Sequence, residues 1–223
     1  MDNTPPIALV LGASRGLGAA LAEALGGAGW QVVAVARTTG ALEELDDRIR
    51  RAGGPAATLA PMDITQDDAM RTLCRSVHDR WGRADLWVHA AIHPAPLSPA
   101  HHIAAKDWDR SVAVNSRAVG VLIPMIEPLL RASDRGTALF FDDTQGEGRF
   151  HGAYGATKAA QIALARHWQA ESERLGPRVV IESPPPMPTA LRARFRPGED
   201  RATLTPCAEV AAGILSRLDQ TPA

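Results

Sequence analysis

The sequence has few of the residue types that mark secreted, metal-binding or nucleic-acid-binding proteins. Only two cysteines occur in 223 residues, Cys74 and Cys207, and they form no Cys-x-x-Cys motif. We therefore expect no disulfide framework, and a small buried side chain in a helix is the commoner role for each. The net charge is −1 with basic and acidic residues interspersed, so no field recruits nucleic acid or an anionic membrane. The expected partners are small molecules or a second copy of the chain.

Long apolar runs are also missing. No uninterrupted apolar stretch approaches the roughly 20 residues of a membrane span, and the opening Met-Asp-Asn-Thr-Pro-Pro lacks the basic and apolar regions of a signal peptide. We therefore expect a cytoplasmic protein with no membrane partner. Hydrophobic residues make up 45% of the chain and charged residues 22%, which excludes general disorder and allows a sizeable core.

A glycine-rich stretch near the start carries the first functional signal. The apolar run Ile7–Leu11 is followed by Gly12, Gly16 and Gly18 and by an alanine-rich segment, 19–28, which predicts a strand, a turn and a helix. Glycines let the backbone approach a phosphate, and a helix N-terminus offers unpaired N–H groups and a positive dipole end. The predicted ligand is a dinucleotide. A tight turn without a ligand is the alternative, although three glycines exceed what a turn needs.

Two arginines favour NADP over NAD as that dinucleotide. The β-branched run Gln31–Ala36 predicts a second buried strand, and it ends at Arg37 instead of an acidic residue. An acidic side chain at this place would hold a ribose 2′-hydroxyl, whereas an arginine accommodates a 2′-phosphate. Arg15, inside the glycine turn, can converge on the same phosphate with a charge-assisted bidentate bond. The alternative is that both arginines are simply solvated.

Strands and helices alternate along the rest of the chain, which predicts a parallel sheet with helices on both faces. Further strands are predicted at 56–62, 85–92, Thr137–Phe141 and Arg178–Glu182, and helices at 40–51, 66–81, 106–131 and 151–175. A last helix is predicted with Thr205 as N-cap and Pro206 at its first position. We expect one doubly wound α/β domain over residues 1–223, with about six strands in the order 3-2-1-4-5-6. After the third strand, Asp63 could accept from an adenine amino group or cap the next turn. Thr65 is the better N-cap for the helix that follows.

Tyr154 and Lys158 give the second functional signal. They stand four residues apart at the start of a predicted helix, so their side chains share one face. A phenol with a pKa of about 10 is a poor base at neutral pH, but a nearby ammonium favours the phenolate. Tyr154 is the only tyrosine in the chain and follows the fifth strand, at the sheet edge where ligands bind. An ordinary exposed Tyr-x-x-x-Lys pair is the alternative.

The histidines do not predict a metal site. His89, His93, His101 and His102 lie close together in the sequence, but no acidic or cysteine partners stand at recognised ligand spacings. We therefore expect no metal.

With both signals placed, the chain resembles the short-chain dehydrogenase/reductase family over nearly its whole length. The matching residues are Gly12, Gly16, Gly18, Asp63, Asn115, Tyr154 and Lys158. The resemblance implies a Rossmann-like sheet and hydride transfer between NAD(P) and an alcohol or carbonyl. It implies Tyr154 as the acid/base, Lys158 as the residue that holds the nicotinamide ribose and lowers the tyrosine pKa, and Asn115 as the anchor of a water in a proton relay. Together with the arginines, it predicts a cofactor site of Gly12, Ser14, Arg15, Gly16, Leu17, Gly18, Arg37, Asp63, Ile64, Ala90, Ala91, Tyr154, Lys158 and Thr189, the last at the nicotinamide carboxamide.

The chain departs from the family at several places. The usual Asn-Asn-Ala-Gly after the fourth strand is replaced by His-Ala-Ala-Ile at 89–92, and the usual Pro-Gly after the sixth by prolines at 184–186. The catalytic serine is missing, and Asp143, with Thr144 beside it, falls at its position. An ionised aspartate can only accept hydrogen bonds and would repel a developing alkoxide. A protonated Asp143 or a displaced Thr144 could substitute.

Three hypotheses follow. The first is an NADP(H)-dependent oxidoreductase acting on a carbonyl or alcohol. The second is an NADP(H)-binding protein without turnover, with a sensor or assembly role. The third is altered chemistry that uses Asp143 as a carboxylic acid.

We also expect a homodimer, from the resemblance and from apolar residues on the helices near 110–131 and 155–175 that exceed what one sheet face obviously covers. These residues are Val119, Leu122, Ile123, Ile126, Ile162, Leu164 and Trp168. A tetramer is less expected, because the seventh strand that the family usually adds is not present in this sequence.

Overall fold

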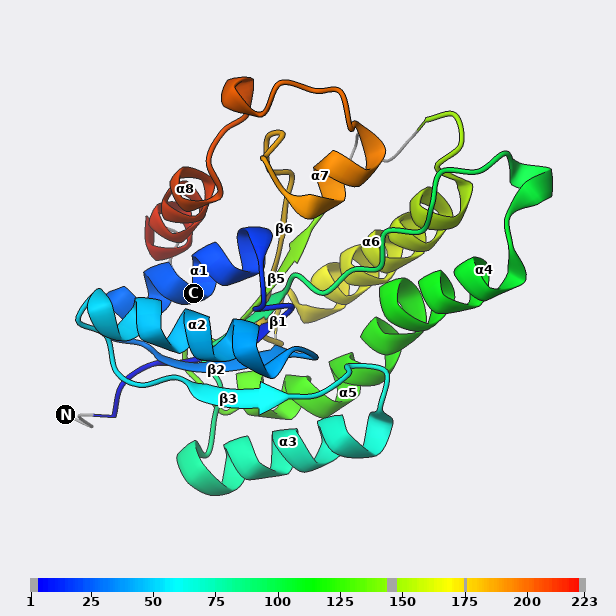
Figure 1. The fold of residues 1–223 in the computed structure, drawn as a ribbon. Coiled ribbons are helices and arrows are strands. Elements are labelled where there is room, and N and C mark those ends of the chain that lie inside the picture. Colours follow the sequence, from blue (N-terminus) through cyan, green and yellow to red (C-terminus); the bar gives the residue numbers. More distant parts are fainter. Residues whose placement is uncertain (1–3, 144–147, 175, 221–223) are drawn as a thin grey trace.

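The computed structural model of the protein describes residues 4–143, 148–174 and 176–220 (Figure 1). Six parallel strands form one sheet in the order β3-β2-β1-β4-β5-β6. The strands are β1 (Ile7–Leu11), β2 (Gln31–Ala36), β3 (Thr58–Pro61), β4 (Leu86–His89), β5 (Thr137–Phe141) and β6 (Arg178–Glu182). The predicted fold class and strand order are confirmed.

Helices cover both faces of this sheet (Figure 1). One face packs against α3 (Asp67–Trp81), α5 (Ala118–Arg131) and α6 (Gly152–Ser172), and the other against α1 (Gly16–Gly27), α2 (Thr39–Arg51) and α8 (Cys207–Gln220). The remaining helical segments are α4 (Ala105–Ser111), the π-helical turn η2 (Val112–Arg117), α7 (Ala190–Phe195) and the 3-10 turns η1 (Ala100–His102) and η4 (Arg201–Thr203). The two apolar layers make β1 and β4 buried on both faces.

The strand order reverses at β1, which pairs with β2 on one side and β4 on the other. Crossovers leave this point in opposite directions, so a crevice opens beyond the carboxyl ends of β1 and β4. Gly12 follows β1 directly and Ala90 follows β4. The sequence therefore delivers both predicted cofactor segments to one edge of the sheet.

Two strands are shorter than predicted. β4 ends at His89 instead of residue 92, and β3 runs over Thr58–Pro61 instead of 56–62. The neighbouring β1 ends at Leu11, opposite His89, because the chain turns away at Gly12. Ala90 N donates to Leu11 O over 2.8 Å, and no carbonyl of β1 lies beyond it to extend the ladder.

The prediction that Thr65 caps α3 is wrong. Gln66 occupies the N-cap position and its side chain makes no capping bond. Thr65 instead forms a turn with Asp63, whose Oδ1 accepts from the Thr65 backbone N–H over 3.0 Å and from its hydroxyl over 2.8 Å. Asp67 and Asp68 in the first turn complement the helix dipole in place of a cap.

The helical run Ala105–Arg131, made of α4, η2 and α5, corrects two expectations. It is long and apolar enough to cross a membrane by length and composition, contrary to the expectation that no stretch comes near that size. Its apolar side packs on the sheet, where Leu122 and Ile126 are fully buried. The apolar excess used to argue for a dimer is likewise mostly core, because Ile162 and Trp168 are also buried and only Leu164 of that set is exposed.

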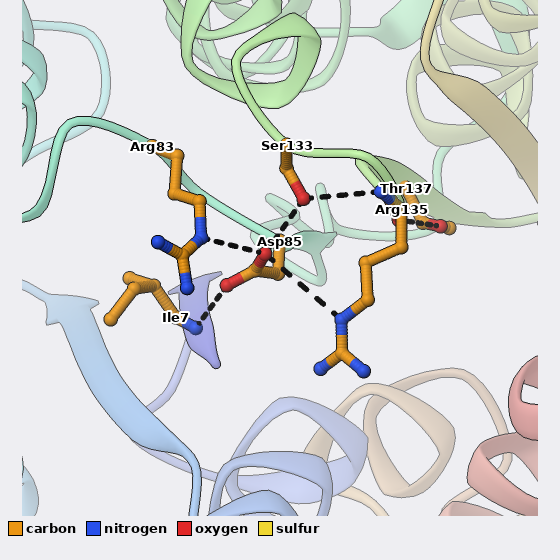
Figure 2. Close-up of polar contacts among 6 residues, drawn as sticks. All are labelled: Ile7, Arg83, Asp85, Ser133, Arg135 and Thr137. Carbon is orange, nitrogen blue, oxygen red and sulfur yellow. Dashed lines mark hydrogen bonds and ion pairs between the residues drawn. The ribbon is translucent and has the colours of Figure 1, made fainter. Parts of the chain in front are cut away.

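A polar cluster around Asp85 lies at the amino ends of β1 and β4, opposite the crevice (Figure 2). The carboxylate of Asp85, which is 3% exposed, accepts from Ile7 N over 2.6 Å, from Ser133 Oγ over 2.7 Å and from Arg83 Nε over 3.1 Å. The Nε of Arg135 lies 4.0 Å from the same carboxylate. Asp85 therefore ties together the amino ends of β1 and β4 and the turn before β5, far from the crevice.

Candidate active site

A cavity of about 510 Å³ lies at the carboxyl ends of the strands. It brings together fifteen of the sixteen predicted site residues: Gly12, Ser14, Arg15, Gly16, Leu17, Gly18, Arg37, Asp63, Ile64, Ala90, Ala91, Asp143, Tyr154, Lys158 and Thr189. Asn115 lies behind the wall, next to the lining residue Val114.

The glycine turn packs tightly against itself and against the segment that follows β4. Gly12 has a φ of +90°, and a Cβ built on it would lie 2.6 Å from the backbone N of Ala91. A Cβ at Gly18 would lie 2.4 Å from Gly12 O, so neither position admits a side chain. The N-cap of α1, Arg15, makes no side-chain capping bond, and the first turn holds no acidic residue. The first N–H groups of α1 are therefore available to a phosphate, and these residues fit a dinucleotide.

Arg15 and Arg37 are exposed, line the cavity and have no ion-pair partner among the described residues. Asp63 differs, because its Oδ2 accepts from Arg110 over 2.7 Å while Oδ1 serves Thr65. Burial acts to raise the pKa of Asp63, but the bonds from Arg110 and Thr65 outweigh it and lower that pKa. Of the two roles considered for Asp63, the structure contains the turn-capping one.

Asp143 faces the tyrosine. The hydroxyl of Tyr154, which is 2% exposed, donates to Asp143 Oδ2 over 2.7 Å. Burial first, and then the charge of Asp143, raise the pKa of Tyr154 well above its ordinary value. Asp142 supports this arrangement, since its Oδ1 accepts from Asp143 N over 2.9 Å and its Oδ2 from Arg166 over 3.0 Å. Thr144, the other candidate at this position, lies outside the described residues.

Lys158 lies one turn further along α6 and is 8% exposed. Its Nζ donates to Oε1 of Gln161 over 2.5 Å. Burial lowers the pKa of Lys158 to about 8, although the charges of Asp143 and Asp142 act to raise it. The ammonium is therefore held inside the protein with a neutral acceptor beside it.

Asn115 is completely buried and joins three segments. Its Oδ1 accepts from His93 N over 2.6 Å, and its Nδ2 donates to His93 O and Thr157 Oγ1, each over 3.0 Å. Its backbone carbonyl accepts from Nε2 of Gln161 over 2.9 Å.

Sequence reasoning missed Gln161, but a signal for it exists. Residues 154, 157, 158, 161 and 165 follow the helical period and are all buried, so Gln161 is a polar residue on the core-facing side of α6. A buried glutamine near a predicted catalytic pair marks a residue with a polar task.

His89 is the last residue of β4 and is 1% exposed. Both of its ring nitrogens are buried without a hydrogen-bond partner in the described part of the chain, and its ring packs against Trp87 and Phe140. Burial, followed by the charge of Lys158, lowers the pKa of His89 to about 3, so the imidazole is neutral. Within residues 4–143, 148–174 and 176–220, no three His, Cys, Asp or Glu side chains form a cluster that could hold a metal.

The sequence also did not predict that α7 packs over the ring of Tyr154. The ring of Phe195 lies 4.9 Å from the Tyr154 ring and 5.0 Å from that of His151. Thr189 begins this helix, its Oγ1 accepting from Arg192 N over 3.1 Å. The short segment gave no sequence signal, because it lacks the periodic apolar pattern that reveals longer helices.

Known proteins are similar to this chain in sequence and in fold. The NADP-dependent 3-hydroxy acid dehydrogenase YdfG of Shigella flexneri is 26% identical over 155 residues, which are 69% of this chain and 61% of the relative. A short chain dehydrogenase from Pseudomonas syringae superposes with a TM-score of 0.90 at 28% identity, over 96% of this chain and 89% of the other. A metagenomic short-chain oxidoreductase solved in complex with NADP superposes with a TM-score of 0.83 at 27% identity, over 98% of this chain and 92% of the other.

The family model for short chain dehydrogenases matches residues 6–200. This stretch contains the glycine turn, the π-helical turn with Asn115 and the Tyr154–Lys158 pair. The chain therefore belongs to the short-chain dehydrogenase/reductase family.

Proposed function

We propose that the protein is an NADP(H)-dependent oxidoreductase that transfers a hydride between the nicotinamide and a carbonyl or alcohol substrate. One observation carries the proposal: the buried Tyr154–Lys158 pair and the glycine turn line the same cavity. The name of the Shigella relative and the NADP complex of the metagenomic oxidoreductase agree with this cofactor.

The chain's own residues account for cofactor choice. The glycine turn and the N–H groups of α1 would bind the diphosphate, and Arg15 and Arg37 would bind the 2′-phosphate of the adenosine ribose. Thr189 would face the nicotinamide carboxamide, with Ala90 and Ala91 along the cavity wall. When bound, the cofactor supplies or accepts the hydride.

Asp143 would occupy the place of the family's serine and act with Tyr154 as a proton-carrying pair. In carbonyl reduction, the Tyr154 hydroxyl gives its proton to the oxyanion left by hydride addition. A phenolate beside an ionised Asp143 would be strongly disfavoured, as the raised pKa of Tyr154 indicates. A protonated Asp143 removes this conflict, because its proton passes to the Tyr154 oxygen as the phenolic proton leaves. Asp143 ends as a carboxylate that solvent reprotonates.

Turnover with a panel of aldehydes, ketones and quinones tests the proposal. Purified protein saturated with NADPH should oxidise the cofactor with at least one carbonyl class, Tyr154→Phe should abolish this while leaving NADPH affinity nearly unchanged, and Lys158→Ala should weaken both. NADPH binding without oxidation by any substrate would contradict the proposal and would leave a nucleotide-binding role without turnover. The single domain over 1–223, the cytoplasmic location and the homodimer stay predictions.

A further inference from the structure

Gln161 links two residues of the site through one side chain. Its Oε1 accepts from Lys158 Nζ over 2.5 Å, and its Nε2 donates to the Asn115 carbonyl over 2.9 Å. Gln161 is 1% exposed, so bulk solvent does not compete for either contact. The bond to Asn115 joins α6 to the π-helical turn, which lies 46 residues earlier in the chain.

The orientation of this amide is fixed by its neighbours. An ammonium can only donate and a backbone carbonyl can only accept, so the oxygen of Gln161 must face Lys158 and its nitrogen must face Asn115. A flipped amide would lose both bonds. The Asn115 side chain is already committed to His93 and Thr157, which leaves its backbone carbonyl as the group that meets Gln161.

We propose that Gln161 is a positioning residue that holds the Lys158 ammonium and fills the space between Lys158 and the Asn115 carbonyl, so that no water relays protons between these two groups. A neutral amide both donates and accepts, but it does not hand a proton from one side to the other as a water does. The proton path through Lys158 is closed at Gln161. Protons for Tyr154 arrive instead through Asp143, which already contacts its hydroxyl.

The groups around Lys158 explain why the neutral acceptor Gln161 affects the stability of the lysine's charged form. Tyr154 lies on the same helix, Asp142 and Asp143 follow β5, and a neutral His89 ends β4. Because Lys158 is buried, each lost acceptor destabilises its charged form. The kinetic part of this inference rests on the proposed oxidoreductase function, whereas the Lys158–Gln161 contact can be measured without turnover.

The composition of the chain makes this contact directly measurable. Lys106 and Lys158 are the only lysines, and Lys106 is exposed. In cofactor-free protein labelled with ¹³Cε-lysine, Lys106 provides the internal reference. Gln161→Leu should lower the titration midpoint of Lys158 by about 1 pH unit, and Gln161→Glu should raise it by about the same amount. Gln169→Leu, on the same helix but bonded to Val179 O, should leave it unchanged.

A Lys158 midpoint within about 0.3 pH unit of the unmodified protein in Gln161→Leu would overturn the positioning role. Unfolding curves identify variants that have lost the fold, and the opposite shift expected for Gln161→Glu gives a second, independent comparison. If the midpoints shift as expected but no carbonyl is reduced by the unmodified protein, the proposed function fails and the positioning role stands.

A second experiment tests whether Gln161 blocks the proton path through Lys158. Gln161→Ser shortens the side chain and makes room for a water between Lys158 and the Asn115 carbonyl. If Asp143 is the proton route, Asp143→Asn should slow carbonyl reduction, and adding Gln161→Ser should restore the rate by about tenfold. No recovery in the double variant would overturn the closed relay.

Discussion

At the scale of the residue, the proposed chemistry depends on the contact between Tyr154 and Asp143. The 2.7 Å bond places the Asp143 carboxyl group against the Tyr154 hydroxyl. Under the proposed function, Asp143 would replace the proton that the phenol gives to the substrate. Asp143→Asn preserves the shape but removes the transferable proton, and we expect it to lower the rate of carbonyl reduction about 100-fold. Asp109→Asn, an exposed carboxylate on α4, is the control. A rate within about twofold of the unmodified protein would mean that Asp143 carries no proton in turnover.

Cofactor preference also belongs to single residues. Replacing Arg37 by Asp puts an acceptor for a ribose 2′-hydroxyl where a phosphate partner stood, so the preference should reverse from NADPH to NADH. Dissociation constants measured by fluorescence titration check this. Arg75→Asp makes the same charge change on α3, outside the cavity, and should leave the preference intact. Equal affinities of the unmodified protein for the two cofactors would contradict the assignment.

At the scale of the element, the Asp85 cluster joins the starts of β1 and β4. Asp85→Asn removes the charge of the buried carboxylate and weakens the acceptor for the buried Ile7 N–H, so we expect a loss of about 1–3 kcal/mol in the free energy of unfolding. Urea unfolding measures this loss, and Asp134→Asn, an exposed site in the same region, is the control. NADPH affinity should not change, because the cluster lies at the amino ends of the strands and the cavity lies at their carboxyl ends. A weakened NADPH affinity at unchanged stability would contradict this assignment.

Elements were predictable from sequence where local pattern decides them. β1, β2, β5 and β6 have the predicted bounds because each is an apolar run ended by turn residues, and the Tyr154–Lys158 pair follows from helical spacing alone. The end of β4 was not predictable, because it is set by the length of β1 beside it. The contact between Lys158 and Gln161 is an i,i+3 pair on α6 and follows from helical spacing. The bonds from Gln161 to the Asn115 carbonyl and from Tyr154 to Asp143 join different segments, and spacing in the sequence does not encode them.

At the scale of the whole molecule, the buried His89 predicts sensitivity to acid. Its pKa is about 3 in the folded protein and near 6.5 when unfolded, so below pH 6.5 the unfolded chain binds a proton that the folded protein does not. The contribution of His89 to stability is therefore complete above pH 6.5 and should fall by about 2 kcal/mol between pH 6.5 and pH 5. Unfolding of His89→Asn at both pH values checks this, with the exposed His101→Asn as control. An equal loss in all three proteins would place the acid sensitivity elsewhere.

Assembly is the other whole-molecule prediction. We expect a homodimer through α5 and α6, with the exposed Leu164 inside the interface. Sedimentation at micromolar concentration should give the mass of two chains, and Leu164→Asp should give that of one. A single-chain mass for the unmodified protein would contradict the prediction.

The two ends of the strands have different roles: the amino ends hold the sheet together and the carboxyl ends form the cavity. The cluster around Asp85 joins the amino ends of the strands, whereas the cavity lies at their carboxyl ends and is lined by loops and by residues of α1, α6 and α7. Residues 184–204 can therefore be exchanged for other sequences in a library without touching this cluster. Selection for new substrates could then vary the residues around the cavity while the Asp85 cluster, at the other end of the strands, stays unchanged.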